Sequence, residues 1–296
     1  MLPLNSEEIG FLDLEEPVGI CSAQQIVAAL MLHQRDRSAV ERILIDLDAN
    51  QSCWDTFMSG PVLPTTSAAN DQGLLTCLRD LGICWNTPTF FVLAPDMAAA
   101  RALRSKTRQW GCTKPVIHTA ERTKHLVGEE WECLLVSMQW QQLAVDAQDI
   151  DFDVVYDPIE PPTLLDPNDA VGELAPQALM AKLMLTGNQA EHLDAEAAVQ
   201  DLYDHAAWWR SFVVGPNLPD QKTGIRHRLK SLQWLPNGWH YDCLYIWARD
   251  SRSAANLQKL CQQWGCTEVE IVAASKADRL LNFPQAPPVV IASWTV

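Results

Sequence analysis

The chain of 296 residues lacks the short motifs that mark most nucleotide and redox sites. It has no Gly-x-Gly-x-x-Gly and no Gly-x-x-x-x-Gly-Lys-Ser/Thr segment, and its 13 glycines fall below the ~7% of average usage. Its nine cysteines include no Cys-x-x-Cys pair. Neither the histidines at 118 and 125 nor His240 with Cys243 have matching residues in the other half of the chain, and a metal site needs three or four converging ligands. We therefore expect no cofactor and no metal ion.

Long apolar runs and positive charge are also scarce. No run approaches the ~20 apolar residues that span a bilayer, and the first residues do not pair a basic segment with an apolar one. The formal net charge is −15, with acidic residues in both halves of the chain, and this field repels nucleic acid and anionic lipid. An odd number of cysteines fits a reducing compartment. We expect a cytoplasmic protein with no membrane insertion and no nucleic-acid partner.

What the sequence does contain is a repeat. The five residues Gln-Trp-Gly-Cys-Thr at 109–113 return at 263–267. The pattern Trp-x-x-Phe-x-x-Gly-Pro-x-Leu-Pro at 54–64 returns at 209–219. Further matches follow the same order in both halves with only short gaps between them. Because tryptophan is a rare residue, we interpret the chain as a tandem duplication of one module.

The repeat divides the chain into two modules of roughly 150 residues each, the size of an ordinary domain. The first module is 1–148 and the second module is 149–296. A linker at 146–167 is predicted from its acidic residues and its four prolines.

The later part of each module alternates short apolar runs with helical segments. In the first module we predict a strand at 89–94, a helix from Asp96 to Trp110, a strand at 114–118, a helix at 121–127 and a strand at 133–138. In the second module the corresponding segments are 243–248, 250–264, 268–273, 276–281 and 289–294. This order predicts an α/β fold with a small three-stranded parallel sheet (β-α-β-α-β) in each module. The two sheets join edge to edge, or the modules pack about a pseudo-two-fold axis.

Helices are expected to precede each sheet. The first spans 22–34, with Ser22 as its N-cap. The next is ambiguous, because 43–47 reads as a strand in the first module whereas the second module favours helix, and we predict a helix over 38–58 that ends at Gly60. A third helix is expected at 69–81, with a partner at 221–232.

The repeated Gln-Trp-Gly-Cys motif is the first candidate site. Its structural interpretation is a helix stop in which glycine adopts the left-handed conformation and Cys266 returns close to Cys261. The alternative is a reactive thiol at Cys112 or Cys266, although no flanking residue supplies the depressed pKa that it needs. The duplicated residues are Trp110, Gly111, Cys112, Trp264, Gly265 and Cys266.

Two other sets of residues are candidates for binding. Asp96 and Asp250 follow the first predicted strand of each sheet, where α/β folds bind ligands, but Asp is also a preferred helix cap. A carboxylate at that position also opposes a phosphate. Unmatched tryptophans and basic residues are candidate interface groups, against a default of core and solvated helix face. These interface candidates are Trp208, Trp234, Trp247, Arg101, Arg104, Arg108, Arg226 and Arg228.

Three hypotheses for function follow. The first is a non-enzymatic protein that acts in interaction, assembly or regulation through a protein partner, favoured by the duplication and the missing catalytic motifs. The second is an enzyme or small-molecule sensor with a site at the strand ends or in the cleft between the modules. The third is a thiol-dependent protein that uses Cys112 or Cys266.

Overall fold

The fold was determined from a computed structural model. The structure describes residues 10–34, 36–60, 78, 81, 85, 87–128, 132–140, 166–187, 193–215, 235, 238–281 and 286–294. Of the predicted segment 69–81 the structure describes only Leu78 and Leu81, whereas the segment 221–232 and most of the linker 146–167 lie outside the described residues. The boundary between the modules lies there too, so it stays a prediction.

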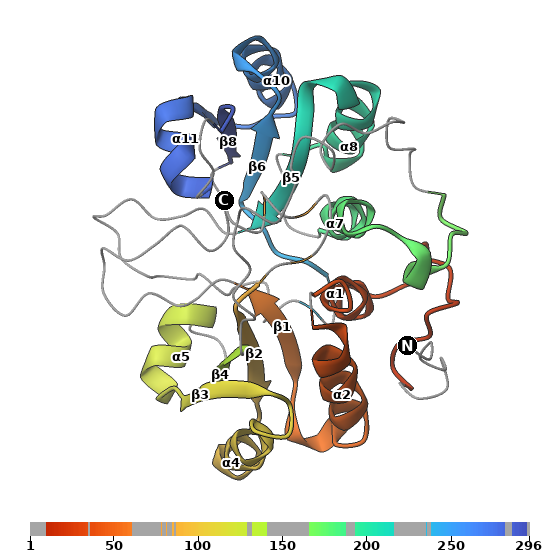
Figure 1. Ribbon diagram of the computed structural model, residues 1–296, viewed down its shortest axis with the longest axis vertical. Helices are drawn as coiled ribbons and strands as arrows, with labels where there is room; N and C mark the ends of the chain where they lie inside the picture. The colour runs from red at the N-terminus through yellow and green to blue at the C-terminus, as the bar shows by residue number, and fades with distance from the viewer. Residues whose placement is uncertain are drawn as a thin grey trace.

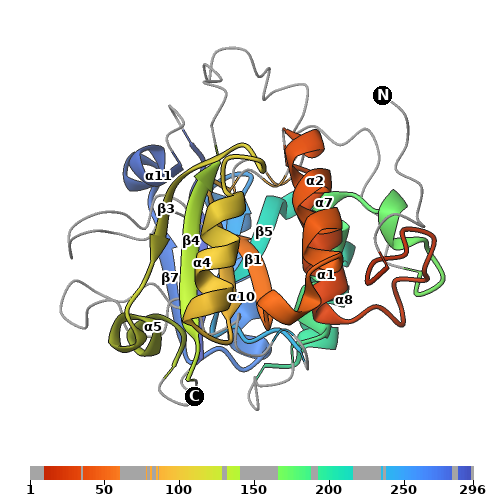
Figure 2. The ribbon, with the colours of Figure 1, turned by 90° about the horizontal axis from the view of Figure 1, so that it is seen from below.

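The first module begins with helices and continues into a sheet (Figures 1 and 2). Its elements are α1 (Ala23–Met31), α2 (Arg37–Asp48), the 3-10 helix η2 (Gln51–Cys53), β1 (Thr56–Gly60), β2 (Thr89–Ala94), α4 (Met97–Lys106), β3 (Cys112–Ile117), α5 (Ala120–Val127) and β4 (Leu134–Trp140). Ser22 caps α1 through the predicted side-chain contact, and Gln25 returns a bond to the backbone of Ser22.

The second module repeats this order. Its elements are η4 (Val171–Glu173), α7 (Pro176–Leu185), α8 (Ala195–Asp204), η5 (Ala206–Trp208), β5 (Trp209–Gly215), β6 (Cys243–Ala248), α10 (Ser251–Gln263), β7 (Glu268–Val272), α11 (Ala274–Leu281) and β8 (Val289–Ser293). The two sheets have the same strand order, β1-β2-β4-β3 and β5-β6-β8-β7. This equivalence supports a shared fold for the two modules.

The predicted three-stranded parallel sheet is wrong. Each module contains a four-stranded sheet, and all of its neighbouring strands are antiparallel. The chain does cross from β2 through α4 to β3 in the same direction, as a parallel unit would, but β4 lies between them and pairs antiparallel with both. Every residue of β2 is buried, so this antiparallel strand has the continuous apolar pattern that is typical of parallel sheets.

The predicted helix 38–58 is also too long. It ends at Asp48, and η2 then leads into β1, an additional strand that pairs with β2. Gly60 is therefore the last residue of a strand and does not stop a helix. The i, i+3 spacing of Trp54 and Phe57 resembles a helical pattern, yet both side chains pack in an aromatic cluster at the start of β1.

The modules meet through equivalent segments. Helices α1 and α7 pack side by side (Figure 1), and in both modules the chain just before them exchanges backbone hydrogen bonds with its counterpart. Val18 donates to the carbonyl of Asp169 at 2.8 Å, and Val171 donates to that of Glu16 at 2.9 Å. Pro17 and Ala170, matched in the repeat, form a β-bridge. Each contact therefore occurs twice, with the roles of the two modules exchanged, which is the contact pattern of a two-fold axis.

Two glycines allow this close approach. Gly19 donates to the carbonyl of Pro167 at 2.8 Å, and Gly172 donates to that of Leu14 at 2.9 Å. A Cβ on Gly19 would lie 2.7 Å from the Pro167 carbonyl oxygen, and one on Gly172 would lie 2.8 Å from the Leu14 Cβ. A Val-Gly pair occurs at 18–19 and again at 171–172, and the glycine of each pair is a steric requirement of the contact between the modules.

Candidate functional site

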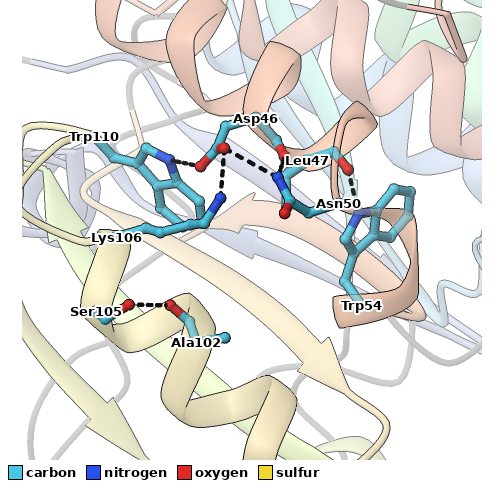
Figure 3. Close-up of polar contacts among 8 residues, drawn as sticks. All are labelled: Asp46, Leu47, Asn50, Trp54, Ala102, Ser105, Lys106 and Trp110. Carbon is cyan, nitrogen blue, oxygen red and sulfur yellow. Dashed lines mark hydrogen bonds and ion pairs between the residues drawn. The ribbon is translucent and has the colours of Figure 1, made fainter.

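A tryptophan–carboxylate hydrogen bond occurs at the same place in both modules. Trp110 donates from Nε1 to Asp46 at 2.8 Å, and Trp264 donates to Asp201 at 2.7 Å (Figure 3 shows the first). Each carboxylate comes from the helix before the sheet (α2 or α8), and each tryptophan follows the helix that covers the sheet (α4 or α10). Both indole rings are buried. The bond therefore ties together two helices whose contacting residues are more than sixty positions apart.

In the first module the carboxylate has additional partners. Lys106 forms an ion pair with Asp46 at 2.5 Å, and the amide of Asn50 donates to it at 3.1 Å (Figure 3). The position equivalent to Lys106 in the second module is Leu260, which cannot form an ion pair. The polar cluster around Asp46 is therefore a property of one module, whereas the indole contact is shared.

Other duplicated contacts join the helices to the first strand of each sheet. Trp54 donates to the carbonyl of Leu47 at 2.8 Å, and Trp209 donates to that of Leu202 at 2.6 Å (Figure 3 shows the first). The amides of Gln24 and Gln177 each bond both the N–H and the C=O of a strand residue, which is Phe57 in β1 and Phe212 in β5. These side chains act in packing, because each polar group is satisfied by the backbone of its own module.

The repeated Gln-Trp-Gly-Cys motif forms the predicted turn. Gly111 has a φ of +72° and Gly265 a φ of +91°, so both adopt the left-handed conformation. In the second module the glycine directly follows the end of α10, whereas in the first a turn separates the end of α4 at Lys106 from Gly111. Cys266 donates its N–H to the carbonyl of Cys261 at 3.1 Å, which places the two residues together as expected.

The thiols of this motif differ between the modules. Burial raises the pKa of Cys112 to about 12, so its reactive thiolate is depleted at neutral pH. The equivalent Cys266 shares a hydrogen bond with Cys261, which lowers the pKa of Cys266 and raises that of Cys261. Both residues are buried in the structure. The raised pKa argues against Cys112 as the reactive thiol.

Asp96 and Asp250 cap the helices that follow the first buried strands. Asp96 accepts from the N–H of Ala99 at 2.8 Å, and Asp250 accepts from that of Ser253 at 2.7 Å. This backbone hydrogen bond lowers the pKa of Asp250. Because the carboxylates occupy the helix N-termini, a second anion there would be repelled.

The residues predicted as interface candidates differ in how far they are exposed. Trp247 is fully buried, with the guanidinium of Arg210 5.3 Å from its ring centroid, so it has no surface to offer a partner. Trp208 is half-buried and stacks on His205 with ring centroids 4.0 Å apart. Trp234, Arg226 and Arg228 lie outside the described residues.

Arg101, Arg104 and Arg108 lie together on the outer side of α4 and the turn after it. All three are exposed: Arg101 and Arg104 are three residues apart, on one side of α4, and Arg108 lies in the turn that follows the helix. Arg42 of α2 is also exposed, with a terminal nitrogen 3.8 Å from the position of a Cβ on Gly111. Within the described part of the chain, none of these four arginines forms an ion pair. We call Arg101, Arg104 and Arg108 the arginine stripe.

Sequence reasoning did not identify Asp46 and Asp201. An Asp-Leu pair recurs at 46–47 and 201–202, and in each module the Asp lies eight residues before the first tryptophan of the Trp-x-x-Phe pattern. This repeated spacing could have identified the two Asp residues. Among the described residues, no group of three or more His, Cys, Asp or Glu could hold a metal ion. No helix in the same part of the chain is long and apolar enough to cross a membrane.

Comparison of the chain with models of protein families, with curated proteins and with solved structures found no match.

Proposed function

We propose that this protein acts in protein–protein interaction or assembly, without chemistry of its own, and that the first module binds an acidic surface of a partner protein through the arginine stripe. The proposal builds on the way the reactive side chains are used. The duplicated Asp, Trp and Gln side chains are engaged in holding helices to the sheets, and burial raises the pKa of the Cys112 thiol.

The observation that carries the proposal is a difference between two equivalent helices. Where α4 and its following turn have Arg101, Arg104 and Arg108, the second module has Ala255, Gln258 and Gln262. The fold therefore does not require the arginines, since the equivalent helix α10 forms without them. Helices α4 and α10 lie at opposite ends of the molecule, so only one end bears the stripe (Figure 1).

The charge of the molecule makes this stripe distinctive. The chain has 37 acidic and 22 basic residues, yet the three guanidinium groups make no ion pair within the described residues. An arginine presents a planar set of donors that suits carboxylates, and arginine is enriched at protein interfaces. A partner with aligned carboxylates would gain several charge-assisted hydrogen bonds without displacing an ion-pair partner among the described residues.

The test compares two variants with the same change in net charge. R101Q/R104Q/R108Q removes three positive charges from the stripe, and K259Q/Q262E/Q263E lowers the charge of exposed positions on α10 by the same amount. Each tagged protein is used to capture partners from the native host, followed by quantitative mass spectrometry.

We expect a stoichiometric partner that the wild-type protein and the α10 variant retain, and that the stripe variant loses. Since truncating an interfacial charge costs about 2 kcal/mol or more where it is desolvated, the loss should be at least tenfold. Equal capture by both variants would overturn the arginine stripe as the binding surface. Absence of any stoichiometric partner would overturn the interaction function itself.

A further inference from the structure

The two sheets differ at one edge. The strand orders place β3 at the edge of the first sheet and the equivalent strand β7 at the edge of the second. An edge strand presents unpaired backbone groups that can pair with another strand unless the sequence prevents it. The residues of β3 and β7 therefore show which of the two edge strands can form backbone hydrogen bonds with an added strand.

Strand β3 is blunted. It has Pro115, which has no N–H, and Lys114, whose φ of +49° is the only positive value of a non-glycine residue in the described part of the chain. Its register with β4 shifts between Thr113 and Val116. A bulge and a proline are two of the devices that natural proteins use to prevent pairing at an edge.

Strand β7 has neither device. Its five residues, Glu268 to Val272, pair with β8 in an unbroken register. The position in β7 that corresponds to Pro115 is Val269. The edge strand β7 of the second sheet is therefore regular, whereas the equivalent strand β3 of the first sheet is not.

The ladder defines which groups of β7 face outward. Ala248 donates to the carbonyl of Pro288, and Trp294 donates to that of Asp242. In β8 and the residues that flank it, the backbone groups of the even-numbered residues therefore point toward β6. The odd-numbered residues of β8 then bond toward β7, and the pair Glu270 with Ile291 turns the backbone groups of Glu270 inward. The backbone groups of Val269 and Ile271 consequently face outward.

One bond confirms this orientation. The amide of Gln258, on α10, reaches the carbonyl of Val269 at 3.3 Å from outside the ladder, and an added strand would replace this bond with one from its own backbone. Within the described residues, nothing bonds the N–H of Val269 or either backbone group of Ile271. The side chains of β7 alternate between exposed Glu268 and Glu270 on one face and partly buried Val269 and Ile271 on the other.

We infer that β7 is a docking edge for an extended segment of a partner protein that alternates basic and apolar residues and adds as a fifth, antiparallel strand. Side chains on neighbouring strands lie on the same face, so basic residues would meet Glu268 and Glu270, where they would compete with the exposed ion pair of Lys276 with Glu270 at 3.6 Å. Apolar residues would extend the row of Val269 and Ile271. This surface is distinct from the arginine stripe, and the inference does not depend on it.

A second copy of the chain fits this edge poorly. If two β7 strands paired antiparallel through their outward groups, Glu270 would lie opposite Glu270, or Glu268 opposite Glu270. Like charges directly opposite one another destabilise a strand pair. The acidic face therefore favours a basic partner over self-association.

The probe is the peptide acetyl-(Lys-Val)₃-Lys-amide, titrated into the ¹⁵N-labelled full chain and followed by NMR. We expect saturable shifts of the Val269 and Ile271 amide signals, with those of Val116 and Ile117 in β3 unchanged. E268Q/E270Q should weaken binding by about 2- to 30-fold, from two cross-strand charge pairs. V269P, which copies the proline of the first module, should abolish binding.

Two modified peptides test strand pairing without altering the protein. In antiparallel pairing the peptide valines lie opposite Val269 and Ile271, so their N–H groups point at β7 and those of the lysines point away. N-methylation of the valines should abolish binding, whereas N-methylation of the lysines should leave it within about threefold. Equal binding of the two N-methylated peptides, or a dimer of the chain formed through β7, would overturn the inference, including in the case where V269P fails to fold.

Discussion

The duplicated indole–carboxylate bond gives a double-mutant cycle with an internal replicate. In the second module, Asp201→Ala removes the acceptor 2.7 Å from the Trp264 Nε1, and Trp264→Phe removes the donor while keeping most of the ring. A hydrogen bond to a charged group contributes about 1.5–3 kcal/mol, and Ala regains roughly 0.5 kcal/mol of helix propensity over Asp. We therefore expect D201A to lower the free energy of unfolding by about 1–2.5 kcal/mol.

The cycle separates the bond from the ring. W264F also loses buried ring area, but that term is the same with and without Asp201 and cancels in the coupling energy. We expect a coupling of about 1.5–3 kcal/mol between D201A and W264F. Urea unfolding followed by far-UV circular dichroism is the assay, since the 12 tryptophans would confuse a fluorescence signal.

The first module provides the comparison. D46A removes the acceptor of Trp110 and also leaves Lys106 without its ion pair. That pair is partly exposed, so it adds at most about 1 kcal/mol to the cost. K106L copies Leu260 of the second module and should bring the effect of D46A closer to that of D201A, leaving the bond from Asn50 to Asp46 as the remaining difference. A coupling energy below about 0.5 kcal/mol in both modules would refute the view that this bond holds the helices together.

Three further predictions concern the module contact, the buried thiol and a buried histidine. G19A and G172A should each destabilise the protein by about 1–3 kcal/mol in thermal unfolding, because the new Cβ meets backbone or Cβ atoms at 2.7–2.8 Å; an unchanged Tm would contradict the steric argument. At neutral pH, Cys112 should react with iodoacetamide at least about 1000-fold more slowly than a peptide thiol, since burial raises its pKa to about 12 from 9.0. Burial lowers the pKa of His118, so the unfolded state binds more protons than the folded state below about pH 6.5, and the free energy of unfolding decreases as the pH is lowered. In H118Q the urea midpoint should therefore decrease less between pH 7.5 and pH 5.5 than in the wild-type protein. An equal decrease in both proteins would contradict this role of His118.

Local sequence patterns predicted the central elements of each module. The strand 243–248 and the Asp caps before α4 and α10 were correct, because caps and buried runs depend on nearby residues. Strand direction was not predictable in this way. The buried strand β2 has an antiparallel neighbour on each side, and its apolar run does not distinguish this from a parallel arrangement.

The candidate site was predictable only in part. The glycine turn after Trp264 is local and was expected. The contact of Trp264 with Asp201 joins residues 63 positions apart, and single-sequence periodicity contains no information about such a pair. The position of β7 at the edge of its sheet could be recognised only from the order of the described strands.

The exchange of bonds between Val18 and Asp169, and between Val171 and Glu16, has a consequence for how the surface can vary. In a symmetric homodimer every substitution appears twice, so a charge added to one pole is added to the other. Covalent joining of the halves removes that constraint while it keeps their effective concentration high. The end with α4 can then carry arginines that the equivalent positions of α10 lack, so the two ends of a single chain differ in charge.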